Sequence, residues 1–313
     1  MDFPPISVIV PIYNGETDLP DLLECLEKQT YPRDRVEYLL VNNNSSDRTA
    51  ELLEKAAIDL AARGFPLIPL AENQIQSSYA ARNTGIRKAR HDLLIFTDAD
   101  CRPDPGWLEE MVKPFEDPDV GLVAGEIIAL TGDSLVEKYT ARREILSQKF
   151  LLQHPFCPYG QTANLGIRKS ALEKVGLFRP YLTTGGDADI CWRIQKQTGW
   201  KLASAPKAIV SHRHRSTIQD FQKQFRRYGR SNRYLHELHG CDLQRNFTTS
   251  EMFYRLGRWI FKEVPKNSLK ILLGKADTVD LFGTPLDLIG FHARSQGQAT
   301  AQLSDNAREI EWL

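Results

Sequence analysis

Strand-like and helix-like patterns of apolar residues alternate along the first hundred residues. Four short runs rich in β-branched and other apolar side chains lack helical spacing and predict strands, namely 6–11, 36–41, 65–70 and 93–96. Between them, apolar residues recur every three or four positions at 19–26 and 49–63, and 78–89 predicts a further helix. Strands that alternate with helices build a mostly parallel sheet flanked by helices, so we predict an α/β fold.

The second half of the chain is less regular. The expected elements are a helix at 107–115, a strand at 120–128, an amphipathic helix at 135–152, a strand at 161–168, a short helix at 170–175 and strands at 201–205 and 210–214. From Thr217 the pattern is helical to the end, with breaks near Pro265 and Pro285 and a loose polar stretch at 296–306. We therefore expect an α/β domain over 1–215 and a helical C-terminal extension over 216–313.

Charge and cysteine content narrow the class of protein. Forty basic residues balance forty acidic ones, so no global charge favours nucleic acid as a partner. The five cysteines are scattered without a CxxC pair, which argues against a disulfide framework and a zinc site and favours a reducing compartment. The N-terminal residues lack a basic start and a long apolar core, so we expect no signal peptide. No run of about 18 apolar residues occurs, and we expect a cytoplasmic protein.

Two carboxylates one residue apart, Asp98 and Asp100, directly follow the apolar run at 93–96. Ligands of open α/β sheets bind beyond the carboxyl ends of the strands, which is where these acids fall. Carboxylate oxygens suit Mg²⁺ or Mn²⁺, and such ions often bridge a protein carboxylate to substrate phosphates. The alternative is that the two acids only stabilise a turn before Pro103 and Pro105.

Polar loops after the first two strands are expected at the same sheet edge as these acids. They are 11–14 and 42–47. The loop after the first strand is not GxGxxG, and GxxxxGK[ST] occurs nowhere in the chain. A dinucleotide enzyme and a P-loop NTPase are therefore disfavoured.

Seven segments in this order resemble the family 2 glycosyltransferases, which have the GT-A fold. They are Val8–Asn14, Val41–Thr49, Ala81–Gly85, Asp98–Asp100, Asn164–Arg168, Gly176–Phe178 and Gly186–Arg193. The resemblance implies inverting transfer of a sugar from a nucleotide-sugar donor, with a UDP-sugar favoured, to an acceptor hydroxyl in polysaccharide or glycolipid biosynthesis. It also implies assistance by Mn²⁺ or Mg²⁺. The acceptor would be a glycan or a lipid-linked glycan.

The resemblance also assigns roles to individual residues. It implies that Asp100 holds the metal and that the donor is bound by Pro11, Tyr13, Asn14, Asn42, Asn43, Arg82, Asp98 and Ala99. Arg82 could instead be an exposed helix arginine. Asp187 matches the catalytic base, although it could simply cap the helix that starts near Ala188. For Asp189 and Arg193, spaced i and i+4, we favour a structural ion pair.

Two positions depart from the pattern of the family. Gly186 stands where the family often has a glutamate before the catalytic aspartate, which could alter contacts with the acceptor. Asn42 stands where the family often has an aspartate, and an amide donates as well as accepts, so the preferred base is less certain.

Two histidines end the last predicted strand, His212 and His214. In similar enzymes a histidine here completes the metal shell, and His212 is the better candidate. Both could instead be surface histidines in a basic patch, because 212–233 contains six arginines and one lysine against a single acid. Within this patch, 224–228 resembles the QxxRW motif only faintly, and we expect Arg226, Arg227, Arg230 and Arg233 to line one helix face, which could also be merely solvated.

The patch and the apolar residues of the tail favour anionic partners and docking. We expect peripheral membrane contact through 213–233 and the C-terminal tail at the inner face, or a homodimer. Two other function classes remain open from the residues. A nucleotidyltransferase would also use paired aspartates on a metal, and a degenerate sugar-binding or scaffold protein would keep the fold without catalysis.

Overall fold

The computed structural model describes residues 3–313 and divides the chain into two compact units. We call the first the sheet unit; it comprises the chain up to Ile128, Leu146–His212 and Ser304–Leu313. The second, the helical unit, comprises Ala129–Ile145 and Arg213–Leu303. The helical part is thus more than an extension after residue 215, because it takes in a segment from the middle of the chain. Met1 and Asp2, at the start of the segment expected to hold no signal peptide, lie outside the described residues.

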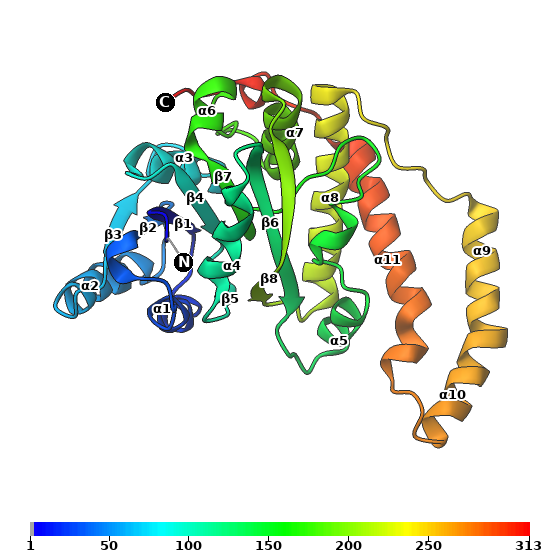
Figure 1. The fold of residues 1–313 in the computed structure, drawn as a ribbon. Helices are drawn as coiled ribbons and strands as arrows, with labels where there is room; N and C mark the ends of the chain where they lie inside the picture. Colours follow the sequence, from blue (N-terminus) through cyan, green and yellow to red (C-terminus); the bar gives the residue numbers. More distant parts are fainter. Residues whose placement is uncertain (1–2) are drawn as a thin grey trace. The chain divides into compact units, whose positions relative to one another are not determined.

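An eight-stranded sheet forms the sheet unit, with the strand order β3-β2-β1-β4-β7-β6-β8-β5 (Figure 1). Its strands are β1 (Ile6–Ile12), β2 (Val36–Asn42), β3 (Leu67–Ala71), β4 (Leu93–Thr97), β5 (Cys101–Pro103), β6 (Val120–Ala129), β7 (Asn164–Arg168) and β8 (Lys201–His212). The half that holds β3, β2, β1 and β4 is parallel, as the alternating pattern predicts. β7 is antiparallel to both β4 and β6, and β5 is antiparallel to β8.

Six α-helices belong to the sheet unit: α1 (Leu19–Glu27), α2 (Thr49–Ala61), α3 (Ser78–Lys88), α4 (Trp107–Val112), α6 (Lys169–Val175) and α7 (Gly186–Thr198). Short 3₁₀ turns occur at Arg33–Arg35, Lys113–Glu116, Gln148–Phe150 and Asn306–Arg308. The helices cover the sheet, so that Val8, Leu40 and Ile95 in its central strands are fully buried. Burial on both faces explains why these strands are apolar runs rather than alternating patterns.

Proline did not interrupt two of the strands. β1 continues past Pro11, which pairs in register with Val41, although we expected the strand to stop there. β8 runs without a break through Pro206, where we expected two separate strands. It ends at His212, so His214, which we expected to lie in the strand, lies outside it.

The helical unit contains α5 (Leu135–Arg142), α8 (Ile218–His239), α9 (Thr249–Arg258), α10 (Val264–Leu272) and α11 (Val279–Thr300), and the π-turn Trp259–Glu263 joins α9 to α10. α8 and α11 lie side by side (Figure 1). Glycine permits their close approach, because a Cβ on Gly229 would lie 1.9 Å from the Arg294 carbonyl oxygen. A Cβ on Gly297 would lie 2.0 Å from the Arg226 carbonyl oxygen.

Several expected helix ends in this unit were wrong. α5 ends at Arg142 and Glu144 has a φ of +48°, so the helix does not reach 152. Gly240, with a φ of +73°, ends α8 instead of a proline. Pro265 lies in the first turn of α10, directly after the π-turn, and Pro285 lies inside α11. Residues 296–300, expected to be loose, continue α11.

Helix composition also bears on membrane insertion. In the described part of the chain, no helix combines the length and the apolar character needed to cross a bilayer.

Candidate functional site

The paired carboxylates lie at the carboxyl end of β4, between that strand and β5. Asp100 Oδ1 lies 3.4 Å from His212 Nε2. The pairing of β5 with β8 produces this contact, since Cys101 is in register with His212. Asp100, Cys101 and His212 offer potential ligand atoms within 4.8 Å of one another. Such a group could hold a metal ion, and each of the three ligand atoms has to be judged by its chemistry.

The thiol of Cys101 does not fit a ligand for Mg²⁺ or Mn²⁺. Complete burial, together with the nearby charges of Asp100 and Asp98, raises the pKa of Cys101 well above its usual value. The thiol lies 3.9 Å from the Ala163 carbonyl oxygen, which it approaches as a donor. Because hard cations prefer oxygen and accept imidazole, Asp100 and His212 are the pair that suits Mn²⁺.

Arg82 belongs to the same cluster and is not an exposed helix arginine. Only 4% of its side chain is exposed, and its Nη2 donates to Asp98 Oδ1 at 2.5 Å. Its guanidinium lies over the ring of Tyr79, 5.7 Å from the ring centre. Its Nε is buried without a hydrogen-bond partner, which is rare for a buried donor. The ion pair orients Asp98 and places a fixed positive charge beside it.

Asp187 lies in the first turn of α7 and accepts a hydrogen bond of 2.7 Å from the Thr162 hydroxyl. The next residue, Ala163, accepts hydrogen bonds from the hydroxyl of Thr97 and the thiol of Cys101. Thr97 and Cys101 flank the segment that holds Asp98 and Asp100. The loop 162–163 therefore connects the candidate base to the paired carboxylates through three side-chain contacts.

The departure at Gly186 has a steric cause. A Cβ at this position would lie 2.6 Å from the ring of Tyr79. The Tyr79 hydroxyl instead accepts a hydrogen bond of 2.9 Å from the Gly186 N–H and so caps the start of α7. Tyr79 thus touches both Arg82 and the residue before Asp187, and sequence reasoning missed it because no motif includes it.

Asp189 has the structural role that we favoured. It is fully buried and pairs with Arg193 at 3.0 Å and with Arg179 at 3.1 Å. The Arg193 guanidinium also donates to the carbonyl oxygens of Val175, Gly176 and Leu177. This network fixes α7 against the end of α6, and because Asp187 lies on α7, the network also holds Asp187 in position.

The polar loops after β1 and β2 meet, as expected, at the carboxyl edge of the sheet. The Asn14 side chain accepts the N–H of Ser46, and Asn14 has a φ of +49°. The Asn42 side-chain oxygen accepts the N–H of Ser45 at 3.2 Å. Tyr13 is 56% exposed. This loop pair thus presents an amide and an aromatic ring at the sheet edge.

Asp47 tightens this loop. Burial raises the pKa of Asp47, but hydrogen bonds from the Thr49 hydroxyl and the Glu16 N–H outweigh it and lower the pKa below its usual value. The carboxylate therefore stays charged and holds the loops together.

Three asparagines of the matched segments serve the scaffold. Asn43 is buried and donates to the carbonyls of Glu72 and Ile75. Asn83 donates to the Phe178 carbonyl and to Glu311, and Asn164 donates to the carbonyls of Glu126 and Ala208. Pro11 is likewise buried within β1. The side chains of Asn43 and Pro11 are thus buried, and their contacts with a donor stay predictions.

The basic patch divides within the helical unit. Arg226 donates to Gln296, and Arg233 pairs with Glu237, so two of the four arginines expected on one face have partners within the helical unit. Arg227 and Arg230 instead line a hollow of about 260 Å³. The other residues that line it are Arg215, Asp220, Lys223 and Gln224. His214 is 7% exposed and belongs to the helical unit, whereas His212 belongs to the sheet unit with Asp100.

Comparison with protein families gives two matches. The sequence model described as glycosyl transferase family 2 matches residues 7–176, and the one described as glycosyl transferase family group 2 matches residues 93–268.

Two curated relatives cover about the same part of the chain. Glycosyltransferase AglE of Haloferax volcanii is 33% identical over 225 residues, 71% of each chain. A second relative, 25% identical over 235 residues (72% of this chain and 71% of the relative), comes from Methanococcus voltae. Its name is dolichyl N-acetyl-alpha-D-glucosaminyl phosphate 3-beta-D-2,3-diacetamido-2,3-dideoxy-beta-D-glucuronosyltransferase.

Among solved structures, the chain resembles the mannosyltransferase PcManGT from Pyrobaculum calidifontis in complex with GDP-Man and Mn²⁺. The TM-score is 0.66 at 17% identity, over 96% of this chain and 88% of the other. At this identity the likeness shows the fold, which is the GT-A fold.

Proposed function

Because this chain belongs to glycosyl transferase family 2, we propose that it transfers a sugar with inversion from a nucleotide sugar to an acceptor hydroxyl, with a divalent metal at Asp100 and His212. The contact of Asp100 with His212, beside the Arg82-bound Asp98, carries this proposal. Family membership disfavours the nucleotidyltransferase alternative. The presence of Asp98, Asp100 and Asp187 around one loop argues against a degenerate scaffold.

The metal proposal depends on the donor set. A carboxylate and an imidazole fit Mn²⁺, and a site with two protein ligands leaves positions for phosphate oxygens and water. When bound, such an ion would offset the negative charge that develops on the departing nucleoside diphosphate. PcManGT, which shares the fold, is in complex with Mn²⁺, and this supports the same class of ion here.

The donor would lie across the carboxyl edge of the parallel strands. Asn42 would bind the base edge, and Tyr13 and Asn14 would flank the nucleoside. Asp98 and Ala99 would contact ribose and sugar, with Arg82 holding Asp98 in place and adding positive charge. We propose a UDP-sugar. Because the amide of Asn42 also suits other nucleobases, the test below compares nucleotide sugars that differ in their nucleobase.

Inversion requires one displacement at the anomeric carbon. The acceptor oxygen forms its bond to that carbon as the bond to the diphosphate oxygen breaks, and the acceptor proton passes to the base. Asp187 would take this proton, because the hydrogen bond from Thr162 orients its carboxylate and the loop 162–163 connects it to the metal side.

The acceptor class follows from the charge of the helical unit. The arginines of the hollow, Arg215, Arg227 and Arg230, form no ion pair among the described residues, and bidentate guanidinium groups suit phosphate oxygens. The Methanococcus voltae relative is named for a dolichyl phosphate-linked sugar. We assign the hollow to the phosphate of a lipid-linked glycan acceptor at the cytoplasmic face, with 213–233 near the membrane surface; a homodimer is the alternative use of the helical tail.

A thermal-shift screen tests the donor and metal assignments. UDP-, GDP- and other nucleotide sugars are each added with Mn²⁺, Mg²⁺ or EDTA. At 100 times its Kd, a donor raises the free energy of unfolding by about 2.7 kcal/mol. We expect one nucleotide to stabilise the protein in the presence of metal and to lose this effect in EDTA.

Asp100→Asn should abolish the metal-dependent shift. Asp104→Asn, an exposed aspartate just beyond β5, is the matched control and should leave the shift unchanged. A shift that survives both EDTA and Asp100→Asn would contradict the metal assignment. No shift with any nucleotide would contradict the function itself.

A further inference from the structure

Large apolar side chains are concentrated on the surface of the rod formed by α9, the π-turn and α10. Among the described residues, 17 large hydrophobic side chains are exposed, and seven of them lie between Phe253 and Leu273. They are Phe253, Tyr254, Ile260, Phe261, Leu269, Leu272 and Leu273. Phe261 is 83% exposed and Leu272 is 84% exposed. A concentration of this kind marks an interaction surface, whereas scattered exposed residues do not.

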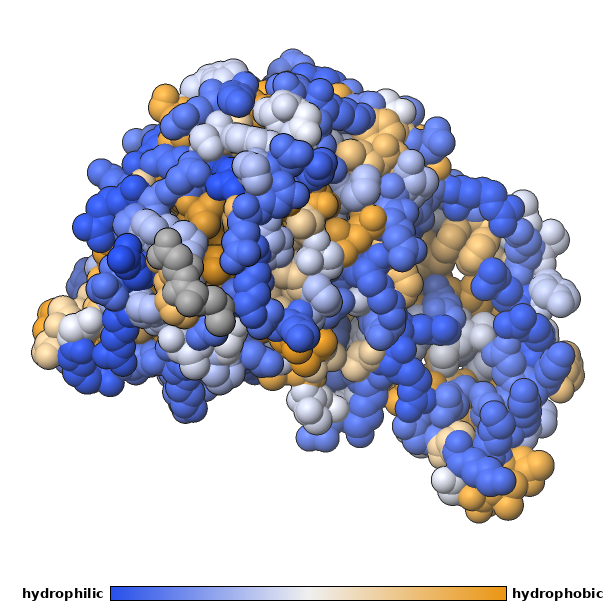
Figure 2. Space-filling view, in the orientation of Figure 1, coloured by the Kyte–Doolittle hydropathy of each residue, from blue (hydrophilic) through white to orange (hydrophobic). Residues whose placement is uncertain are grey.

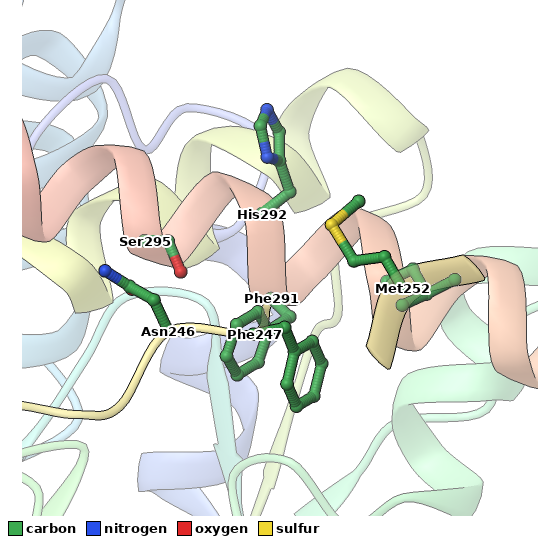
Figure 3. A pocket seen from close by; sticks show the side chains of 7 residues that line it. Asn246, Phe247, Met252, Phe291, His292 and Ser295 are labelled. Atoms are coloured by element: carbon green, nitrogen blue, oxygen red, sulfur yellow. The ribbon is translucent and has the colours of Figure 1, made fainter. Parts of the chain in front are cut away.

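The other side of the rod is attached to α11. The Trp259 indole N–H donates to the Leu281 carbonyl at 2.7 Å, and the Asn267 amide donates to the Asp280 carbonyl at 2.6 Å. At the start of α9, Phe247 stacks on Phe291 of α11 with ring centres 3.5 Å apart, and Met252 lies close to them (Figure 3). These contacts hold the rod in one orientation, so its exposed apolar side chains stay exposed.

The same rod is strongly basic. Residues 249–275 contain six basic side chains and two acidic ones. Both acids are already paired, Glu251 with Arg245 and Glu263 with Arg258. Lys262, Lys266, Lys270 and Lys275 are exposed and form no ion pair among the described residues. Positive charge therefore lies next to the apolar surface without compensation.

We propose that α9 and α10 dock this protein on an anionic lipid bilayer. Aromatic and aliphatic side chains enter the boundary between headgroups and acyl chains, and the lysines contact the lipid phosphates. Figure 2 shows apolar side chains on this part of the surface, at the end where α10 finishes. A second copy of the chain is a poorer occupant, because a two-fold contact would bring the four unpaired lysines of each copy together.

Docking does not depend on catalysis, so it can be measured without a donor or an acceptor. It extends the proposed function, since a lipid-linked acceptor would be presented at the same surface. Failure of the donor screen would leave this inference intact, and failure of vesicle binding would leave the donor site intact.

Flotation with vesicles tests the inference. The full chain is mixed with vesicles of phosphatidylcholine alone or with 30% phosphatidylglycerol. We expect flotation with the anionic vesicles and its loss as salt rises. The double variant Phe261→Ser with Leu272→Ser should weaken binding by at least about 30-fold, since two large side chains lose their burial. Replacing Lys262, Lys266 and Lys270 by glutamine should weaken it by about 100-fold at low salt.

Ile58→Ser is the matched control, because Ile58 is 72% exposed but lies on α2 of the sheet unit. It should leave binding unchanged. Sedimentation velocity without lipid tests the rival occupant. A dimer that Phe261→Ser with Leu272→Ser converts to a monomer, without vesicle binding by the parent chain, would overturn the proposal. Equal binding of the parent chain and the double variant to anionic vesicles would also overturn it.

Discussion

The sheet unit and the rod of α9 and α10 contain similar apolar residues and use them in opposite ways. Val8, Leu40 and Ile95 in the sheet unit are fully buried between layers of helices. α9, the π-turn and α10 contain no buried residue. Hydrophobic content alone therefore does not identify a core. An apolar face becomes part of a core only where neighbouring elements cover it, and α11 covers only one side of the rod.

Polar groups show the same contrast. In the sheet unit, Asn164, Asp189 and Arg193 are buried with their hydrogen bonds made, which orders the elements around the candidate site. On the rod, exposed lysines remain available to an outside partner. If this difference reflects function, substitutions in the sheet unit should affect chemistry and folding, and those in the helical unit should affect attachment.

The largest effect is expected for Asp187→Asn. The amide oxygen can still accept the Thr162 hydroxyl, so the fold and donor binding should persist, but the proton acceptor is lost. We expect kcat to fall by about 10²–10⁴-fold, measured with a water-soluble acceptor analogue. Asp287→Asn is the counterpart in the helical unit, where Asp287 accepts the Tyr139 hydroxyl at 2.6 Å, and it should retain kcat. Near-normal turnover by Asp187→Asn would remove Asp187 as the base.

The next largest effect concerns stability. Arg193→Met removes the guanidinium that lies 3.0 Å from the buried Asp189 carboxylate, so we expect a loss of about 3–5 kcal/mol in the free energy of unfolding. Arg142→Met removes the pairs with Asp277 and Asp280, but its side chain is 46% exposed. That change should cost less than about 1 kcal/mol. Urea unfolding measures the loss in the free energy of unfolding for each variant. Equal losses would contradict the proposed difference between the two units.

The smallest effects compare two helix starts. Tyr79→Phe removes the hydroxyl that accepts the Gly186 N–H, at a cost of about 1 kcal/mol. Thr248→Ala removes the capping box of α9 at a similar cost, about 1 kcal/mol. Tyr79→Phe should also lower kcat a few-fold, because the start of α7 carries Asp187, whereas Thr248→Ala should not. If both variants keep full turnover, Tyr79 has only a structural role.

The parallel half of the sheet could be predicted from the sequence because each strand there is a buried apolar run between amphipathic helices. The π-turn and the true ends of α5 and α8 could not, since Glu144 and Gly240 end helices through local backbone conformation that periodicity does not encode. Pro206 led us to expect two separate strands, but β8 continues through it without a break.

Within the site, the sequence predicted where the residues lie better than it predicted what their side chains bind. Asp100 and His212 meet as expected, although the three-residue strand β5 that aligns His212 is too short to recognise from its pattern. Asn43 was expected to bind the donor, and its amide holds the β3–α3 loop instead of facing outward. An asparagine looks the same in sequence whether its partner is a ligand or a carbonyl, and only the fold distinguishes them.

The final residues of the chain have a consequence for its synthesis. Glu311 accepts hydrogen bonds from Asn83 and Arg87, and its carbonyl accepts the N–H of Leu177. A ribosome delivers these partners more than a hundred residues before it delivers Glu311. Until Glu311 has been synthesised, the buried side-chain amide of Asn83 lacks one of its two hydrogen-bond acceptors. The sheet unit thus reaches its finished state only after the whole helical unit has been synthesised, and no single cut releases either unit intact.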